Sequence, residues 1–455
     1  MKISKTLALA LGIALGTGPA LAIDNVDAEL AEMRRLVEGL QQKVDAQEEQ
    51  LAAQGRNLEE AQEVVRRTQA DTEAVSGLSS FLNSLEVDGV VAVSYNYNVL
   101  GNPDNSAAAT PGGANNPAGP GLNQGASGNF YPFHGDHDTF QVDQVWFGMG
   151  KPATEESRAG FRFDLLYGQT AAFLGNGSST NGRVNGMDSL GDFYVNQAYI
   201  EYLAPIGDGV MVTAGKFGTL AGAEVGKTTD NFNVTAGNLY NLLQPIDHYG
   251  VLVSSDVGPL DVTVGAVNSQ TLGVGSLDDN SSKTLVVQAG IGDDELNGAA
   301  TIFWGAEGGS NHDDLGIFDV LINANPSDDL SLWLNFDYVW AEGTATAGLG
   351  SGGDKSAWGL AAAGRMALTD ATGFSLRAEY VHDSNGLLGL GGSNVNDASV
   401  WGLTATLDHT LADSLLVRLE SRYDRVDSRS QFFNSTGNNL DRGQWVLLAQ
   451  AVYTF

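Results

Sequence analysis

Three arginines and three carboxylates lie two residues apart in the last quarter of the chain. The pairs are Arg377 with Glu379, Arg418 with Glu420, and Arg422 with Asp424. Residues two apart on a β-strand point to the same face of the sheet. Charges of both signs on one wall of a channel could set a field that orients dipolar or anionic solutes. They could equally neutralise one another and stiffen the wall, and the sequence leaves both interpretations open.

Weaker candidates for the lining of such a channel lie on other alternating segments. They are Arg162, Asp164, Lys216 and Arg365. Each is a charged residue between apolar neighbours, which on a strand predicts a polar inner face and an apolar outer face.

Acidic clusters lie in Gly- and Asn-rich stretches, at residues 134–138, 277–280 and 311–315. They could bind Ca²⁺ or bridge lipopolysaccharide through divalent cations, but none has the spacing of an EF-hand loop. Solvated loop acids are the favoured interpretation. His134 and His137 are three residues apart, and with six histidines in the chain a zinc site is not expected. No metal site and no cofactor is predicted.

Catalysis and nucleic-acid binding find little support in the sequence. The chain contains no cysteine, and no G-x-S-x-G, H-E-x-x-H or phosphate-binding glycine loop stands in the required context. Its net charge of −32 repels DNA and RNA. The chain is therefore not expected to be an enzyme or to bind nucleic acid.

Residues 1–22 have the pattern of a secretory signal peptide. Lys2 and Lys5 precede an apolar region from Thr6 to Leu15, and Ala20-Leu21-Ala22 resembles an A-x-A cleavage site. The apolar run is shorter than the roughly 20 residues that a membrane-spanning helix needs. The mature chain is expected to begin at Ile23.

Residues 23–84 show a helical period. Apolar residues recur with 3,4 spacing from Ile23 to Val75, between flanks rich in Glu, Gln and Arg. A heptad pattern of this length predicts a coiled coil, although a single amphipathic helix is the alternative. At 1.5 Å per residue, a helix over 23–75 would reach about 80 Å. We expect a stalk in a homo-oligomer, with a trimer favoured. The apolar residues with 3,4 spacing form the seam along which the helices would pack, and this seam alone does not distinguish a two-helix from a three-helix coiled coil.

After Leu85 the period changes to two. In LSLWLNFDYVW, Leu, Phe, Tyr and Trp alternate with Ser, Asn and Asp. Sixteen such segments are predicted: 86–99, 139–151, 158–171, 193–204, 209–217, 247–256, 259–269, 283–292, 296–306, 315–325, 329–341, 356–368, 373–383, 398–409, 414–426 and 443–455. Short turns and long Gly/Asn/Ser/Asp loops alternate between them, which is typical of an up-and-down outer-membrane barrel. Residues 85–455 are therefore predicted to form an all-β transmembrane barrel of about 16 antiparallel strands.

The apolar faces are too extensive to fill the interior of a barrel of this size. Barrels of 16–18 strands enclose an aqueous channel, and the inward positions of the predicted strands are mostly Arg, Asp, Glu, Ser and Asn. Lipid outside and water inside is the expected arrangement. The last segment, GQWVLLAQAVYTF, then reads as the strand that closes the barrel against the first, near Val91 to Val99.

The stretch from residue 197 to 255 resembles the OmpL-like family of β-barrel porins. The resemblance rests on Gln197-Ala198-Tyr199, on the G-K-F-G-T segment from Gly215 with Gly222 and Glu224, and on Pro245, His248, Gly250 and Val251. The strand GFRFDLLYG, with Arg162 and Asp164, is also similar to the family pattern. The N-terminal coiled coil resembles those of stalked trimeric porins and of LbtU-type siderophore porins.

The resemblance implies a passive outer-membrane channel without a cofactor. If the general porin plan holds, the third long loop, about 218–246, folds into the lumen and sets the constriction, rather than packing on the rim. Its candidate constriction residues are Glu224, Lys227, Asp230 and Asn231.

The function predicted from the sequence is a trimeric outer-membrane porin for small hydrophilic solutes or ions. The coiled coil would lie in the periplasm, and the barrel would contact lipid and lipopolysaccharide. One alternative is a tether that reaches peptidoglycan through the coiled coil, with the barrel as its anchor. Another is a more selective channel, such as a siderophore porin.

Overall fold

The structure is a computed structural model of the 455-residue chain. It describes residues 26–99, 132–134, 138–176, 189–190, 193–270, 280–307, 313–343, 354–388, 390, 397–427 and 443–455. The chain divides into two units, Met1–Ser84 and Leu85–Phe455, and each is described by itself. The predicted signal peptide lies outside the described residues and stays a prediction.

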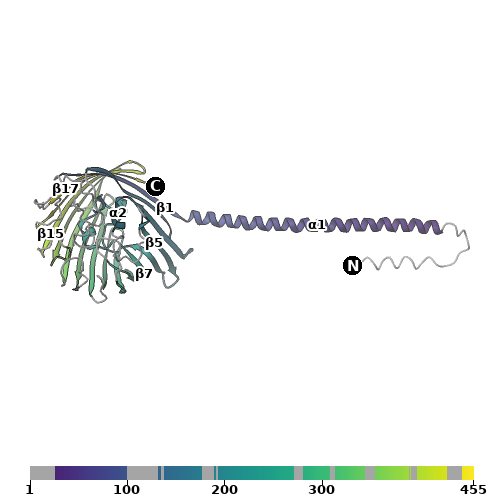
Figure 1. The fold of residues 1–455 in the computed structure, drawn as a ribbon, viewed down its shortest axis with the longest axis horizontal. Coiled ribbons are helices and arrows are strands. Elements are labelled where there is room, and N and C mark those ends of the chain that lie inside the picture. Colours follow the sequence, from purple (N-terminus) through teal and green to yellow (C-terminus); the bar gives the residue numbers. More distant parts are fainter. Residues whose placement is uncertain are drawn as a thin grey trace. The chain divides into compact units, whose positions relative to one another are not determined.

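The first unit contains one helix, α1 (Val26–Asn83), which is drawn without interruption in Figure 1. Its 58 residues span about 87 Å at 1.5 Å per residue. Ser84 caps the end, because its backbone N–H donates to the Ser80 carbonyl at 3.2 Å and its hydroxyl donates to the Phe81 carbonyl at 2.7 Å. The predicted helix is confirmed, whereas its pairing in a coiled coil stays a prediction. None of the described helices combines the length and apolar character that a membrane span requires.

The second unit is a closed antiparallel barrel of sixteen strands. A further two-residue strand, β4 (Ser189–Leu190), pairs only with the start of β5. The barrel strands are β1 (Glu86–Asn98), β2 (Thr139–Lys151), β3 (Ala159–Tyr167), β5 (Phe193–Ala204), β6 (Val210–Gly218), β7 (Asp247–Val257), β8 (Leu260–Val267), β9 (Thr284–Gly292), β10 (Leu296–Ala306), β11 (Asp314–Ser327), β12 (Leu330–Ala341), β13 (Lys355–Thr369), β14 (Thr372–Ser384), β15 (Ala398–Ala412), β16 (Leu415–Val426) and β17 (Gly443–Thr454).

The barrel closes where the sequence predicts. β1 pairs with β17 in a register that runs from Val90 opposite Thr454 to Asn98 opposite Val446. Every other barrel strand pairs with its neighbours along the chain, as Figure 1 shows. Closure leaves no open strand edge, which a sheet surrounded by lipid must avoid.

The predicted strands match the observed ones closely, with one clear error. The strand predicted over 158–171 ends at Tyr167, and a short helix, α2 (Gln169–Asn176), follows it. Gly168 separates the two with a φ of 112°, a conformation that side-chain-bearing residues rarely adopt. The prediction extended the strand past Gly168, although Gln169 and Thr170 no longer continue the alternation of apolar residues.

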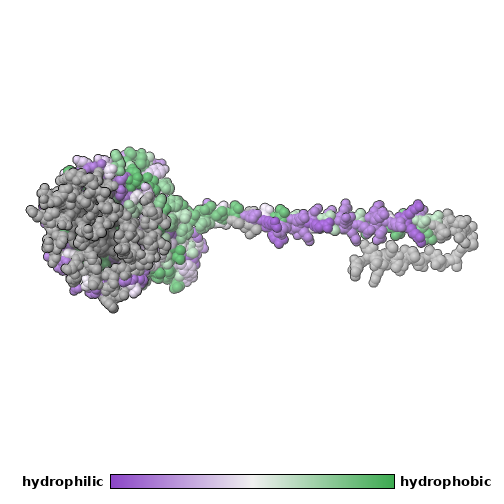
Figure 2. Space-filling view, viewed as in Figure 1, coloured by the Kyte–Doolittle hydropathy of each residue, from purple (hydrophilic) through white to green (hydrophobic). Residues whose placement is uncertain are grey.

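The outward residues of the strands are apolar and exposed. On β17, Trp445, Leu447 and Tyr453 are exposed, while Gln444 and Gln450 on the opposite face of the strand are buried on the inner side. In Figure 2, hydrophobic residues gather on the visible flank of the barrel wall, whereas hydrophilic residues dominate α1. An apolar outer wall is what contact with lipid acyl chains requires.

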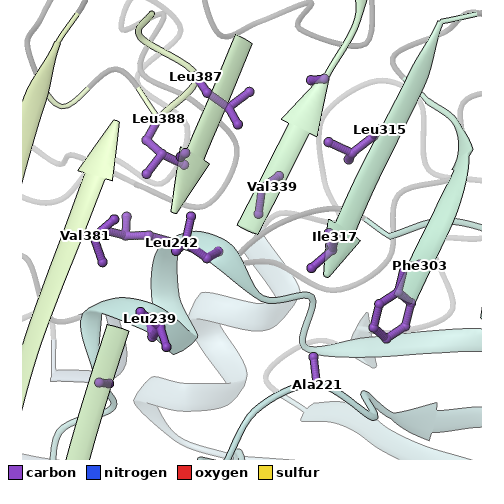
Figure 3. Packing of buried hydrophobic residues seen from close by; sticks show 14 of the residues in the cluster. Ala221, Leu239, Leu242, Phe303, Leu315, Ile317, Val339, Val381, Leu387 and Leu388 are labelled. Atoms are coloured by element: carbon purple, nitrogen blue, oxygen red, sulfur yellow. The ribbon is translucent and has the colours of Figure 1, made fainter. Parts of the chain in front are cut away.

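The inner face is not polar at every level. Inward residues near the long-loop ends of the strands form a buried apolar cluster with α3 (Asn238–Leu243), and it includes Val339 and Val381. Figure 3 shows Leu239 and Leu242 of α3 among these wall side chains. The sequence predicted mostly polar inward positions facing water, and at this level the inward positions are instead apolar and covered by a segment of chain inside the barrel.

Candidate functional site

The segment between β6 and β7, residues 219–246, is the candidate site, and we call it the inner loop. It contains a single turn, η3 (Thr228–Asp230), and the helix α3. All residues from Asn233 to Ile246 are buried. Its hydrogen-bond partners are inward side chains of strands on several sides of the barrel, so the loop lies within the lumen.

The first part of the inner loop crosses the barrel. The Leu220 carbonyl accepts from Gln288 Nε2 on β9 at 3.0 Å. The Gly226 carbonyl then accepts from Gln144 on β2 at 2.6 Å, and Lys227 Nζ lies 2.5 Å from Asp88 Oδ2 on β1. Because β9 and β1–β2 stand on opposite sides in the strand order, residues 220–227 span the interior.

The rest of the inner loop follows the wall from β17 back to β12. Arg377 Nη1 donates to Glu224 Oε1 at 2.5 Å and to the Thr235 carbonyl at 2.7 Å, while its Nε donates to Glu379 at 3.0 Å. This guanidinium on β14 is fully buried. It therefore bonds two carboxylates and the loop backbone at once.

Arg422 on β16 makes a similar set of contacts. Its Nε donates to Asp424 Oδ2 at 2.8 Å and its Nη1 to the Ala236 carbonyl at 2.6 Å. Its Nη2 donates to Asn238 Oδ1 at 3.0 Å, and Asn238 Nδ2 donates to Asp424 Oδ1 at 2.8 Å. The pair and the start of α3 form one buried network.

The carboxylates of the wall accept hydrogen bonds from the loop backbone. Glu420 accepts from the N–H groups of Val234 at 2.6 Å and Thr235 at 3.1 Å. Glu379 accepts from the Leu239 N–H at 3.3 Å. Charge-assisted bonds of this kind are stronger than neutral ones. They satisfy N–H groups of a loop that would otherwise be buried without partners.

Arg418 differs from the other two arginines, because its contacts are to neutral groups. It donates to Gln450 Oε1 on β17 at 2.5 Å and 3.0 Å, to Thr228 Oγ1 at 2.5 Å, and to the Asn231 carbonyl at 3.4 Å. All six charged residues of the predicted ladder are buried. All six are bonded to the inner loop, Asp424 through the side chain of Asn238. The contacts thus indicate that these residues hold the inner loop against the wall. They do not line the channel as a row of solvated charges.

The four candidate constriction residues have different surroundings. Glu224 and Lys227 bond to wall residues, as described above. Asn231 folds back on the loop, since its Nδ2 donates to the Val225 carbonyl at 2.7 Å and its Oδ1 accepts from the Val225 N–H at 2.9 Å. Asp230 is exposed. Residues 225–231, apart from the buried Thr228, thus form the accessible edge of the loop, and the segment from Asn233 onward is buried.

Burial changes the ionisation of two loop residues. It raises the pKa of Glu224, and the Arg377 guanidinium opposes this shift. Burial, with the negative charges of Asp247 and Glu224, also raises the pKa of Tyr240. The Tyr240 phenol therefore stays neutral, and the Glu224 carboxylate depends on Arg377 for its charge.

The weaker candidates form local ion pairs. Arg162 bonds Asp88 Oδ1 and Asp164 Oδ1, both at 2.7 Å. Arg365 bonds Asp408 at 2.6 Å. Lys216 is buried, 3.3 Å from Asp247 Oδ2 and 3.9 Å from the ring centre of Tyr194. Arg162 and Arg365 are partly exposed, so water reaches these two ion pairs.

Sequence reasoning missed several contacts of the inner loop. Asp88, Asp319, Asp337 and Gln244 all bond to it or belong to it. The alternation in LSLWLNFDYVW places Asp337 on the inner face, so its inward position could be predicted from the sequence. The acidic clusters at 134–138, 277–280 and 311–315 lie partly outside the described residues, as does His137. Among the described residues, no group of three or more His, Cys, Asp or Glu side chains is placed to hold a metal.

The barrel unit matches a known protein family almost from end to end. Residues 84–455 match the family described as "Putative beta-barrel porin-2, OmpL-like". The chain belongs to this family. The resemblance predicted from residues 197–255 is thereby confirmed, whereas the likeness of α1 to the coiled coils of stalked porins stays a prediction. No curated protein sequence matches this porin.

Solved structures with a similar fold are also porins and outer-membrane channels. An anion-selective porin from Comamonas acidovorans is 11% identical, covering 82% of this chain and 99% of that one, with a TM-score of 0.50. The outer-membrane channel DcaP of Acinetobacter baumannii is 13% identical, covering 82% and 97%, with a TM-score of 0.49. The trimer form of Vibrio cholerae OmpT is 12% identical, covering 82% and 99%, also with a TM-score of 0.49. At these identities the likeness concerns the fold alone.

The family and the closed barrel together assign the function class. This porin is an outer-membrane channel protein with sixteen transmembrane strands. The expectation that it has no enzymatic activity stays a prediction.

Proposed function

We propose that small uncharged, hydroxyl-bearing solutes diffuse between the inner loop and the wall formed by β5–β8. The observation that carries this proposal is the course of the loop. Residues 220–227 cross the interior from β9 to β1, and the remainder covers β12–β17. Among the residues that the structure describes, none of the inner loop's hydrogen bonds reaches the inner face of β5–β8 in its half nearest the short turns.

The chemistry of that face is mostly neutral and polar. Thr213 stands opposite Glu201, and the Ser254 hydroxyl lies 2.8 Å from that of Thr263 on the next strand. These side chains are half-buried, as is Tyr199. Hydroxyl groups that donate and accept can exchange hydrogen bonds with a passing polyol. Glu201 is the one charged side chain in this group, while Arg162 beside it is paired with two aspartates.

A bulky side chain on this face should narrow the passage. We expect Ser254→Trp to lower the single-channel conductance in planar bilayers severalfold. Val253→Trp is the matched control, because Val253 lies on the same strand with its side chain exposed on the outer face, where tryptophan meets lipid. Equal conductance in the two variants would place the passage elsewhere in the barrel.

The solute class has its own measurement. In a liposome-swelling assay, sorbitol should enter faster than gluconate, which has a similar size and carries a negative charge. The reversal potential in a salt gradient should be small, because Arg162 and Arg365 are paired with aspartates and Glu201 adds only a single negative charge to the proposed passage. Faster entry of gluconate with strong anion selectivity would refute the proposal that the solutes are uncharged. The location of the passage would still be tested separately by the conductance of Ser254→Trp.

The proposal extends to a homotrimer joined through α1 in the periplasm. Along this helix the predicted seam is exposed, with Met33, Val37, Leu40 and Val44 each about half accessible or more. An apolar stripe of this length on a polar helix fits helices packed around a shared seam. In this arrangement lipid and lipopolysaccharide surround the barrels, and the tether to peptidoglycan is the alternative use of the same stalk.

Polar substitutions on the seam should dissociate the trimer. We expect Leu40→Asp with Val44→Asp to abolish cross-linked trimers and to replace triple conductance steps with single ones. Gln41→Asp, off the seam, should leave both unchanged. Intact trimers after both seam substitutions would show that α1 does not hold the assembly together.

A further inference from the structure

Two buried carboxylates stand opposite each other where the inner loop leaves and rejoins the wall. Asp319 on β11 and Asp337 on β12 are direct cross-strand partners and are 1% and 0% exposed. Directly opposed residues on antiparallel strands have Cβ atoms about 4.5–5.5 Å apart. Among the described residues, no arginine, lysine or histidine forms an ion pair with either carboxylate.

An amide oxygen without a hydrogen-bond donor lies beside them. Gln244, at the end of the inner loop, is 1% exposed, and its Nε2 donates to Asp337 Oδ2 and to Asn335 Oδ1, both at 2.8 Å. Its Oε1 and the second oxygen of Asp337 are buried without a hydrogen-bond partner. Buried acceptors without partners are costly and uncommon. The two oxygens without partners, Gln244 Oε1 and Asp337 Oδ1, lie beside the Asp319 carboxylate. This arrangement indicates a missing positive charge.

A proton shared by the two aspartates would answer only part of this need. It would bridge one pair of oxygens and leave the Gln244 amide oxygen without a partner. A hard divalent cation bonds several oxygens at once, takes carboxylate, amide and water ligands together, and neutralises two carboxylates. We propose that Asp319, Asp337 and the amide oxygen of Gln244 form a binding site for one such cation, with Ca²⁺ as its probe.

The site would fasten both ends of the inner loop. The Gly222 N–H donates to Asp319 Oδ2 at 3.2 Å, and a Cβ at Gly222 would lie 2.2 Å from Gln244 Oε1. The two ends of the loop therefore meet at the aspartate pair. Asn335 supports the same point, since its Nδ2 donates to Asp319 Oδ2 at 2.5 Å. Occupancy of the site and the position of the loop are then linked.

The test uses the full mature chain refolded in detergent free of lipopolysaccharide and stripped with EDTA. Titration calorimetry with CaCl₂ should show one Ca²⁺ per chain, and Ca²⁺ should raise the unfolding temperature. Asp337→Asn and Asp319→Asn should each weaken binding by at least about tenfold. Both changes preserve shape, and heat-modifiable migration on gels reports whether each barrel has folded.

Asp261→Asn is the control, because Asp261 is an exposed acid at the opposite, short-turn side of β8. It should bind Ca²⁺ as the unchanged chain does. Absence of binding in the unchanged chain would overturn the proposal and leave the shared proton as the account of the pair. Equal binding in all variants would also overturn it, because the ion would then be held elsewhere.

Discussion

Replacing Arg377 with alanine is expected to lower the free energy of unfolding by about 3–5 kcal/mol, the cost of breaking one side of a buried ion pair. The guanidinium lies between Glu224 and Glu379 and also donates to the Thr235 carbonyl. Its loss leaves two buried carboxylates without a counter-charge and removes a bond to the loop. Urea unfolding in detergent, followed by tryptophan fluorescence, measures the change.

Arg365→Ala is the matched comparison for this experiment. Arg365 also pairs with an aspartate on the inner wall, but its side chain is 38% exposed. Exposed ion pairs contribute only about 0–1 kcal/mol, so this variant should remain close to the unchanged chain. A double variant, Arg377→Ala with Glu224→Gln, should recover part of the loss, because one uncompensated charge is then removed. Equal effects of the two arginine substitutions would contradict the role assigned to Arg377.

Excision of the inner loop is expected to give the largest change in conductance. Residues 223–243, replaced by two glycines, can be removed without stretching the chain, because Gly222 and Gln244 are already in contact range. No barrel pairing uses the deleted residues, so the sixteen-strand barrel should still form. Conductance in planar bilayers should rise severalfold, since the segment that crosses the lumen is gone.

The excised barrel should also be less stable than the complete one. Leu239, Leu242 and Leu243 of α3 pack on inward apolar residues of the wall, and each buried leucine contributes about 1.5–3 kcal/mol when it leaves water. A control in which Thr229 and Asp230, at the accessible edge of the loop, are replaced by glycine should keep both conductance and stability near their original values. Unchanged conductance after excision would mean that the loop does not limit the passage.

Much of the barrel could be predicted because its rules are local. Contact with lipid on one side makes alternate residues apolar, so the period of two marks each strand, and turn length marks the two ends of the barrel. The closing pair of β1 with β17 followed from the same reasoning, since the last strand has an apolar outer face from Trp445 to Tyr453. The prediction failed at residues 168–171, where Gly168 turns the backbone and the helix α2 begins at Gln169.

The candidate site was predictable only in part. Alternation placed Arg377, Arg418 and Arg422 on the inner face, and the resemblance to porins indicated an inward loop. The bonds between them could not be predicted, because Glu420 meets Val234 across 186 positions of sequence. Asp319 was overlooked, since a single inward aspartate carries no signal until its cross-strand partner is known.

The sequence alone determined which faces of the strands meet lipid, that about sixteen strands form the barrel, and that a long helix precedes them. Those properties depend on residues that are close in sequence and on the apolar lipid that surrounds the barrel. The tertiary structure alone decided what the inward charges contact. An arginine two residues from a glutamate is compatible with charges that line a water-filled channel. It is equally compatible with buried charges that hydrogen-bond to a loop inside the barrel. The approach of residues 224–244 to that wall, from far along the chain, excludes water and makes each charge a partner of the loop.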